Sequence, residues 1–398
     1  MDLITEITCW SIIKCFDLYE FMVRFAIRII FPMVKWYVDR ELGILGHNAE
    51  GKGPLGIRVH DEKEFYLRVF VRRHTGLFEA HMDKVCTIND VKAMVISGLQ
   101  STKTLAFMHP LSTILDRFNL QSRSKVWQVG AEHYDLGNDL FETILCKNLL
   151  YTCAYWRNSS DLESAQIAKM DLVARKLKLK PGMKVLDIGF GYGALDYHLA
   201  KHYGVSVVAI SISKGQIQHA TKLCDGLPVE FRICDYRDLN EKFDRIAVIG
   251  MIEHVGHKNY REFFKVCNRC LTDDGLMLLH TIVNNDRNIL GFDYWCHKYI
   301  FPNGCIPYYL QVCKAIEDVF LIEDWQNFGY DYYKTLAAWE VKFEENWDKL
   351  APKYGERFHR MWHIYLNCAQ AFFQTRSYQL WQIVLSKRGV ERGYESVR

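Results

Sequence analysis

Residues 184–193 read Lys184-Val-Leu-Asp-Ile-Gly-Phe-Gly-Tyr-Gly193, and this stretch decides the fold. An apolar run that is typical of a buried β-strand leads into a turn that contains Gly189, Gly191 and Gly193. A helical stretch follows, and the apolar run 205–210 is predicted to form a second strand. The sequence therefore predicts a strand–helix–strand unit whose first turn lets the backbone approach a ligand closely.

The spacing of these glycines indicates the kind of ligand. G-x-G-x-G is tighter than the G-x-G-x-x-G pattern of dinucleotide-binding proteins, and Asp187 lies inside the strand just before the turn. Alternating glycines after such an acid are typical of proteins that bind S-adenosylmethionine (SAM). Many nucleotide-binding enzymes carry a carboxylate about 20 residues further on, at the end of the second strand. This chain has Ser211 and Ser213 there instead.

The rest of the pattern beyond residue 126 alternates between strands and helices. Because helical stretches separate most of the predicted strands, we expect a mainly parallel, doubly wound α/β sheet. Ligands bind such sheets at the carboxyl ends of the strands. The predicted strands are 184–189, 205–211, 229–233, 244–250, 275–282, 319–324 and 378–386.

Composition limits the classes of function. The chain has 398 residues, enough for one large domain and a smaller one. Its net charge of only +3 does not indicate a surface that binds nucleic acid. Thirteen cysteines without framework spacing indicate free thiols in a reducing, cytoplasmic setting. Cys267 and Cys270 form a C-x-x-C pair, but no second pair has the spacing of a zinc site, so no metal is predicted.

The N-terminal region is apolar without resembling a membrane span. Five charged residues within 8–31 recur every three or four positions, which places them on one narrow helical stripe; these are Lys14, Asp17, Glu20, Arg24 and Arg28. Pro32 is expected to interrupt the helix. This segment either lies on a membrane surface or packs against protein, and both interpretations stay open. We expect an amphipathic helix over 1–32, a small and mostly helical domain over 33–122 with a strand near 65–70, and the α/β domain over 123–398.

Several further motifs accompany the glycine turn in a fixed order. They are Glu132-His-Tyr-Asp-Leu-Gly-Asn-Asp-Leu-Phe141, Tyr151-Thr-Cys-Ala-Tyr-Trp156, Gln216, Asp235-Tyr-Arg-Asp-Leu239, Glu253-His-Val-Gly256, Leu278-Leu-His-Thr-Ile282, Lys298-Tyr-Ile-Phe-Pro-Asn-Gly304 and Asp324-Trp-Gln-Asn-Phe-Gly329. From about Phe118 to near the C-terminus, this ordered set closely resembles the cyclopropane-fatty-acyl-phospholipid synthases, relatives of the mycolic acid cyclopropane synthases.

The resemblance implies a class I SAM-dependent methyltransferase. Such an enzyme adds a methylene group to the cis double bond of an unsaturated phospholipid acyl chain and forms a cyclopropane ring. The implied cofactor-binding residues are Tyr151, Thr152, Asp187, Gly189, Gly191, Gly193, Ser211, Ser213, Gln216, Asp235, Tyr236 and Arg237. The glycine turn departs from the family, because Phe190, Tyr192 and Ala194 replace its usual cysteine, tryptophan and glycine.

The resemblance also implies a bound base. Methyl transfer to an alkene leaves a carbocation-like species, and a base must remove a methyl proton while water is excluded. In the family a bicarbonate ion is that base. The positions that hold it match Cys153, Glu253, His280, the backbone of Ile282, and Tyr332. Cys368, after a shift of one residue, matches a further family cysteine that has been treated as part of the active site.

Alternatives follow from what the sequence leaves open. The same first step could end in a methyl or methylene branch, and a lipid-binding protein without catalysis is the rival from another class. The family's paired tryptophans are absent near 80–85, so a lipid-presenting role for 33–122 stays open. The aromatic segment 283–312 is interpreted as a lid over an acyl tunnel or as a contact in a homodimer. Membrane phospholipid and the membrane surface are the expected partners.

Overall fold

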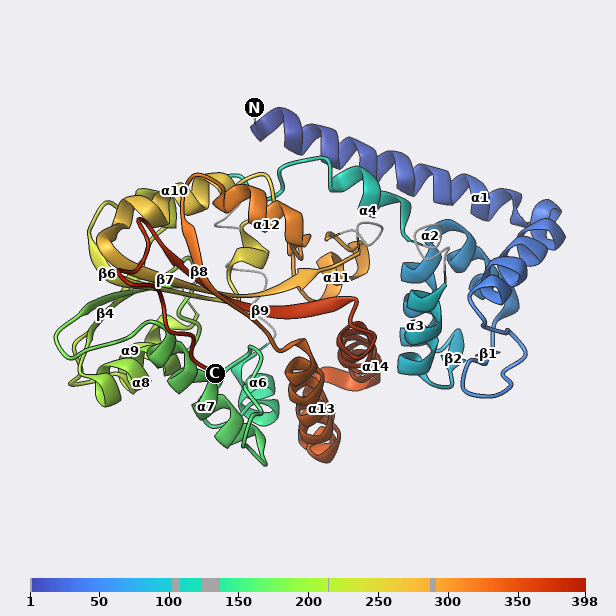
Figure 1. Ribbon diagram of the computed structural model, residues 1–398. Helices are drawn as coiled ribbons and strands as arrows, with labels where there is room; N and C mark the ends of the chain where they lie inside the picture. Colours follow the sequence, from blue (N-terminus) through green and yellow to red (C-terminus); the bar gives the residue numbers. More distant parts are fainter. Residues whose placement is uncertain (1, 102–107, 124–136, 214, 287–290) are drawn as a thin grey trace. The chain divides into compact units, whose positions relative to one another are not determined.

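The structure, a computed structural model, describes residues 2–101, 108–123, 137–213, 215–286 and 291–398 (Figure 1). The chain divides into two compact units. Unit 1 comprises Met1–Leu120, Asp286–Pro302 and Glu344–Ser377; unit 2 comprises Gln121–Asn285, Asn303–Phe343 and Tyr378–Arg398. The first division falls near the expected boundary at 122, but two later segments return to unit 1. The aromatic segment 283–312 is thereby shared between the units.

Unit 2 is built around a seven-stranded sheet in the order β5-β4-β3-β6-β7-β9-β8. Its strands are β3 (Lys184–Ile188), β4 (Ser206–Ser211), β5 (Val229–Ile233), β6 (Phe243–Ile249), β7 (Leu271–Asn284), β8 (Leu321–Asn327) and β9 (Tyr378–Ser386). The first five are parallel, and β9 runs antiparallel to both β7 and β8. All seven predicted strands are present, and the glycine turn follows the central strand β3.

Helices cover both faces of this sheet. On one side lie α10 (Tyr260–Cys270) and α12 (Tyr309–Ile316); on the other lie α7 (Leu162–Lys176), α8 (Ala194–Tyr203) and α9 (Ile217–Leu223) (Figure 1). Each layer buries its own hydrophobic core, one including Phe263 and Val312 and the other Val173 and Leu199. Also in unit 2 are α6 (Asn138–Ile144) and α13 (Gly329–Glu345), whose last two residues are assigned to unit 1. The doubly wound α/β prediction is confirmed.

Unit 1 is mostly helical. Its helices are α1 (Asp2–Ile44), α2 (Glu62–Met82), α3 (Val91–Gln100), α4 (Pro110–Leu115), α11 (Tyr294–Tyr299) and α14 (Trp347–Gln374). Two strands of three residues, β1 (Ile57–Val59) and β2 (Cys86–Ile88), pair antiparallel. Across the parts of the chain that the structure describes, no helix combines the length and apolar character needed to cross a bilayer.

Two local predictions in unit 1 need correction. Residues 65–70 are not a strand but lie within α2, which begins where the Asp61 carboxylate accepts a hydrogen bond from the amide of Glu64. The first helix does not stop at Pro32 but continues to Ile44. Proline removes one backbone hydrogen bond, yet Val34, Val38 and Leu42 are buried beyond it. Their packing stabilises the continued helix.

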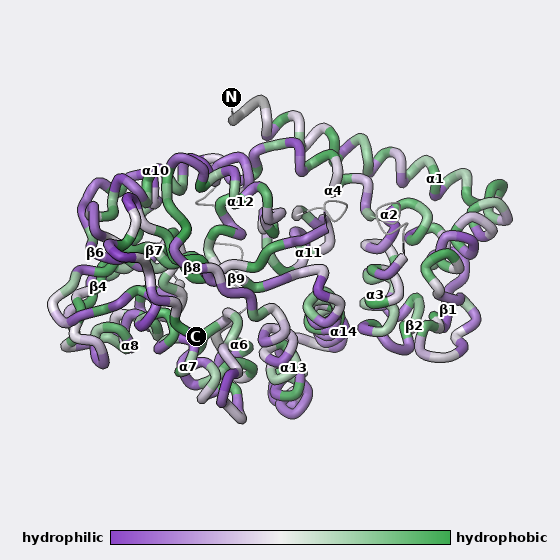
Figure 2. The backbone as a smooth tube through the Cα atoms, viewed as in Figure 1, coloured by the Kyte–Doolittle hydropathy of each residue, from purple (hydrophilic) through white to green (hydrophobic). Residues whose placement is uncertain are grey.

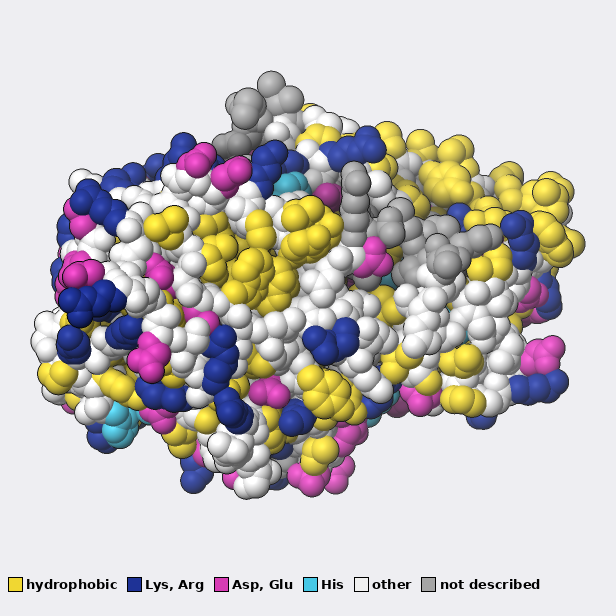
Figure 3. Space-filling model, viewed as in Figure 1, with side chains coloured by type: hydrophobic (Ala, Val, Ile, Leu, Met, Phe, Trp, Pro, Cys, Tyr) yellow, Lys and Arg dark blue, Asp and Glu magenta, His cyan; other side chains and the backbone are white. Residues whose placement is uncertain are grey.

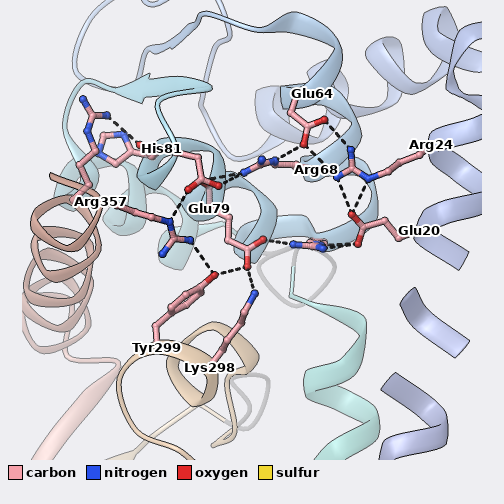
Figure 4. Close-up of polar contacts among 12 residues, drawn as sticks. Glu20, Arg24, Glu64, Arg68, Glu79, His81, Lys298, Tyr299 and Arg357 are labelled. Carbon is pink, nitrogen blue, oxygen red and sulfur yellow. Dashed lines mark hydrogen bonds and ion pairs between the residues drawn. The ribbon is translucent and has the colours of Figure 1, made fainter. Parts of the chain in front are cut away.

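An ionic network joins α1, α2 and α11 within unit 1 (Figure 4). Glu20 of α1 is almost fully buried and accepts hydrogen bonds from Arg24 and from Arg72 of α2. Arg72 also pairs with the buried Glu79, which accepts from Lys298 at 2.6 Å and from the Tyr299 hydroxyl at 2.8 Å. Part of the charged stripe of α1 therefore faces α2 rather than water.

Candidate active site

A cavity opens at the carboxyl ends of β3, β4, β5 and β6 in unit 2. Eight of the predicted cofactor-binding residues line it: Gly189, Gly191, Ser211, Ser213, Gln216, Asp235, Tyr236 and Arg237. The sequence did not point to several other lining residues, among them Gln121, Gly250 and Met251, and it assigned no role to His254 and Val255 of the quoted motif 253–256. Most of the lining residues that were missed are apolar or glycine, so no distinctive side chain signalled them.

The three motif glycines have different roles. A Cβ atom on Gly191 would meet nothing within 4 Å, and its φ of +56° is unfavourable for other residues. Gly191 therefore leaves open space in the cavity wall. A Cβ atom on Gly193 would lie 2.8 Å from the Cβ of Ala220 in α9, so Gly193 serves helix packing. A Cβ atom on Gly189, whose φ is +96°, would lie 3.0 Å from the Cβ of Met251, so Gly189 leaves room for the Met251 side chain.

Asp187 does not line the cavity but lies buried beneath the turn in β3. Its carboxyl group interacts with that of the buried Asp196 of α8. Burial raises the pKa of both carboxyl groups, that of Asp196 further through the neighbouring Asp187, so the pair retains a proton at pH values where a solvent-exposed carboxyl group would be ionised. The sequence analysis did not single out Asp196.

Some polar groups on the cavity wall hydrogen-bond to one another, and others have no protein partner within the described residues. Asp235 accepts from the Arg237 amide at 2.9 Å and pairs with the Arg237 guanidinium at 2.8 Å. The Ser211 hydroxyl accepts from the Ser213 amide at 3.1 Å. Among the described residues, no group bonds the buried Ser213 hydroxyl or that of Tyr236. Buried hydroxyls without partners are costly, so these two are available to a polar ligand.

Glu253 lies just beyond β6, in a short helical turn over Ile252–His254. Its Oε1 accepts from the Thr281 hydroxyl at 3.0 Å and from the Ile282 amide at 2.8 Å. The Ile282 amide thus holds Glu253. Burial raises the pKa of Glu253, and these two hydrogen bonds oppose that rise. Its Oε2 is buried and has no partner within the described parts of the chain.

His280 of β7 lies beside the same segment. Its Nδ1 is 3.2 Å from the side-chain amide nitrogen of Gln382 in β9, which can only donate. Nδ1 must therefore accept, so the neutral ring carries its proton on Nε2. Burial holds the pKa of His280 well below its ordinary value, so the ring stays neutral. Its Nε2 is buried and finds no hydrogen-bond partner in the described regions.

Cys153 and Tyr332 belong to two segments that pack together. The amide of Ala154 donates to the Thr335 hydroxyl of α13 at 3.1 Å, and that of Trp156 donates to Asp331 at 2.8 Å. The rings of Tyr151 and Tyr332 both lie against Trp339 of α13. Burial and the neighbouring Asp331 raise the pKa of the Cys153 thiol well above its ordinary value, so it stays protonated. Thr152 accepts a hydrogen bond from Lys169.

Cys368 lies on α14 in unit 1, whereas the other candidate residues belong to unit 2. Burial raises the pKa of its thiol well above the ordinary value, so Cys368 is not a thiolate nucleophile. Residues 132–136 of the first quoted motif lie outside the described residues. Cys267 and Cys270 are buried in α10 with protonated thiols, because burial raises the pKa of both.

The parallel sheet, the glycine turn and the cavity at the strand ends define a class I SAM-dependent methyltransferase. The family model for mycolic acid cyclopropane synthetase matches residues 121–383. The chain belongs to this family.

Individual relatives agree with this assignment. The chain is 45% identical over 374 residues to Cyclopropane-fatty-acyl-phospholipid synthase of Escherichia coli, covering 92% of this chain and 97% of that protein. It is 36% identical over 261 residues to Cyclopropane mycolic acid synthase 3 of Mycobacterium tuberculosis, covering 61% and 91%. A match over 92% of the chain must include much of unit 1, so the resemblance begins well before Phe118.

Solved structures of the family match about two thirds of the chain. The cyclopropane synthase MmaA2 from Mycobacterium tuberculosis matches with a TM-score of 0.61 and 31% identity, covering 66% of this chain and 98% of that one. Mycolic acid cyclopropane synthase CmaA1, complexed with SAH and CTAB, matches with a TM-score of 0.61 and 30% identity over the same shares.

Proposed function

We propose that this chain transfers a methylene group from SAM to the cis double bond of unsaturated acyl chains in phospholipids, forming a cyclopropane ring. Near-complete coverage of the Escherichia coli synthase supports this substrate class. One observation carries the proposal: two buried groups have no partner in the described chain, Glu253 Oε2 just beyond β6 and His280 Nε2 in the neighbouring strand β7. A protein that only holds lipid has no use for them.

The cavity residues would hold SAM. Gly189 and Gly191 allow close approach, the Ser213 hydroxyl is available to the ribose, and the Ser211 hydroxyl can still donate while it accepts from the Ser213 amide. When bound, SAM supplies a methyl group made electrophilic by its sulfonium. An alkene is a weak nucleophile, so the chain must position the double bond against that methyl and exclude water from the cation that results.

The two unpartnered groups have the chemistry to hold a bicarbonate ion. Bicarbonate carries one O–H donor and negatively charged acceptor oxygens. Glu253 Oε2 can accept that O–H, and His280 Nε2–H can donate to an acceptor oxygen. Thr281 and Ile282 hold Glu253 in place. We propose that Glu253, His280, Cys153 and Tyr332 hold this base so that it accepts the proton from the added methyl group.

Incubation with SAM and phospholipid vesicles tests the proposal. Vesicles with cis-monounsaturated chains should yield acyl chains that gain one CH₂ and lose the double bond. Vesicles with saturated chains are the control and should yield no product. A gain of CH₂ with a retained double bond would instead indicate the methylene branch, and no mass change would indicate a lipid-binding protein.

We further propose that α1 docks on the membrane surface. Apolar side chains on its outward face are strongly exposed, including Phe25 at 84%, Ile29 at 86% and Met33 at 73%. Hydrophobic and hydrophilic residues alternate along α1 (Figure 2), and hydrophobic side chains gather over it (Figure 3). The charged Glu20 faces α2 instead. A stripe this long is unusual on a surface that faces only water.

The two sequence interpretations of this segment are therefore compatible. One face of α1 packs within unit 1, where Val23 contacts Leu67 and Val71, and the opposite face is open. Removing residues 1–31 would expose that core, so point variants are the sharper test. Phe25→Glu with Ile29→Glu should abolish co-sedimentation with anionic vesicles while leaving the melting temperature unchanged. Val341→Glu, at an exposed apolar site in unit 2, is the control. Undiminished binding by the double variant would reject docking through α1.

A further inference from the structure

Lys169 on α7 is a fully buried cation close to the candidate active site. Its Nζ donates to the Thr152 hydroxyl at 2.9 Å, one residue before Cys153. Within the described residues no carboxylate forms an ion pair with it. Lys176 lies seven residues further along α7. It is equally buried, but its Nζ lies 3.4 Å from the Asp324 carboxylate.

A buried ammonium without a paired anion is costly unless it is used. Burial lowers the pKa of Lys169 to about 8, and Asp187 partly offsets this effect, so the group is still mostly charged at pH 7. Its positive charge acts to lower the pKa of Cys153, against the larger effect of burial, and also that of His280; both residues are proposed to hold the base. The Asp187–Asp196 pair carries one negative charge when it holds one proton, and Asp187 acts on Lys169, but no ion-pair contact joins the two in the described chain.

The proposed base creates a need for positive charge. A bicarbonate beside Glu253 places two negative charges in a buried site, and the sulfonium of SAM balances only one. We propose that Lys169 is a positioning residue that supplies the second positive charge and so sets the affinity of the site for the bicarbonate ion. This inference rests on the proposed function. It assigns a role to a lysine that otherwise interrupts an apolar helix face.

Lys169→Met removes the charge and keeps the length of the side chain. A methionine should pack in this apolar setting, because replacing a buried charge with an apolar residue is often neutral or stabilising. We expect an unchanged or raised melting temperature, SAM affinity within about twofold, and a half-saturating bicarbonate concentration raised about tenfold or more. The rise of melting temperature that bicarbonate causes in SAM-loaded wild type should shrink accordingly.

Two further variants separate charge from packing. Lys169→Arg keeps the charge and should restore most of the bicarbonate affinity that Lys169→Met loses. Lys176→Met removes an equally buried lysine. Its partner Asp324 still pairs with Arg398 in this variant, so the half-saturating bicarbonate concentration should stay within about twofold of the wild-type value. The inference is overturned if Lys169→Met binds SAM and bicarbonate as wild type does, or if Lys169→Arg and Lys169→Met are equally impaired. A wild type whose rate and melting temperature ignore bicarbonate would instead reject the bound base itself.

Discussion

The change Glu253→Gln tests the proposed base site while preserving the local structure. The glutamine carbonyl oxygen can occupy the place of Oε1 and still accept from the Thr281 hydroxyl and the Ile282 amide. The amide nitrogen then occupies the place of Oε2. An acceptor without a partner in the described chain becomes a donor, and the negative charge is lost.

The expected effect falls on turnover. Glu253 no longer accepts the O–H of the bound base, and His280, neutral and donating from Nε2, cannot replace it. Losing one electrostatic or acid–base element typically costs about 10²- to 10³-fold in turnover, or about 3–4 kcal/mol of transition-state stabilisation. Glu253 does not line the cofactor cavity, so SAM affinity should stay within about twofold.

Single-turnover rates with unsaturated vesicles and calorimetry with SAM measure the two quantities separately. The wild type should also lose activity in buffer stripped of bicarbonate and regain it on addition, whereas Glu253→Gln should respond weakly. A folded variant that turns over at the wild-type rate would refute this reasoning.

Three other changes give distinct outcomes. Gly191→Val should weaken SAM binding at least about tenfold by calorimetry, because a branched side chain at φ +56° fills space in the cavity wall. The control Gly226→Val has similar backbone strain, at φ +76°, but lies away from the cavity, so this variant should bind SAM with wild-type affinity. Burial favours a raised pKa for Glu79, but Arg72, Lys298 and Tyr299 lower it to about 2, below its unfolded value. Glu79 should therefore contribute up to about 3 kcal/mol above pH 4.5, lost as the pH falls toward 2, and Glu79→Gln should flatten this part of the unfolding profile. Gln382→Leu removes the donor that fixes the His280 tautomer, so turnover should fall about tenfold with SAM affinity kept; equal rates would show that the tautomer is unimportant.

Much of unit 2 could be predicted from the sequence because its signals are local. The central strands β3, β4 and β6 contain short apolar runs, and the glycine turn directly follows β3. Eight predicted residues line one cavity because parallel strands end at the same edge of the sheet. Asp187 does not line this cavity, because side chains of a strand alternate between the two faces of the sheet and its carboxyl group is buried beneath the turn.

The remaining features depend on contacts between distant parts of the chain. His280 faces Gln382 only because β9 inserts antiparallel between β7 and β8 with that register. The return of 286–302 and 344–377 to unit 1 is also invisible in a local pattern. Lys169 did leave a signal, since it lies on a helix face that otherwise buries residues such as Met170 and Val173.

The central claim is that the chain adds a methylene group and that a base removes one proton from the incoming methyl. Mass analysis combined with proton NMR of the acyl chains, after incubation with SAM carrying a fully deuterated methyl group, tests both parts: mass counts the deuterium atoms and NMR shows whether a double bond remains. A cyclopropane product should retain two of the three deuterium atoms and contain no double bond. An acyl chain that retains all three, or that keeps its double bond, would contradict the account.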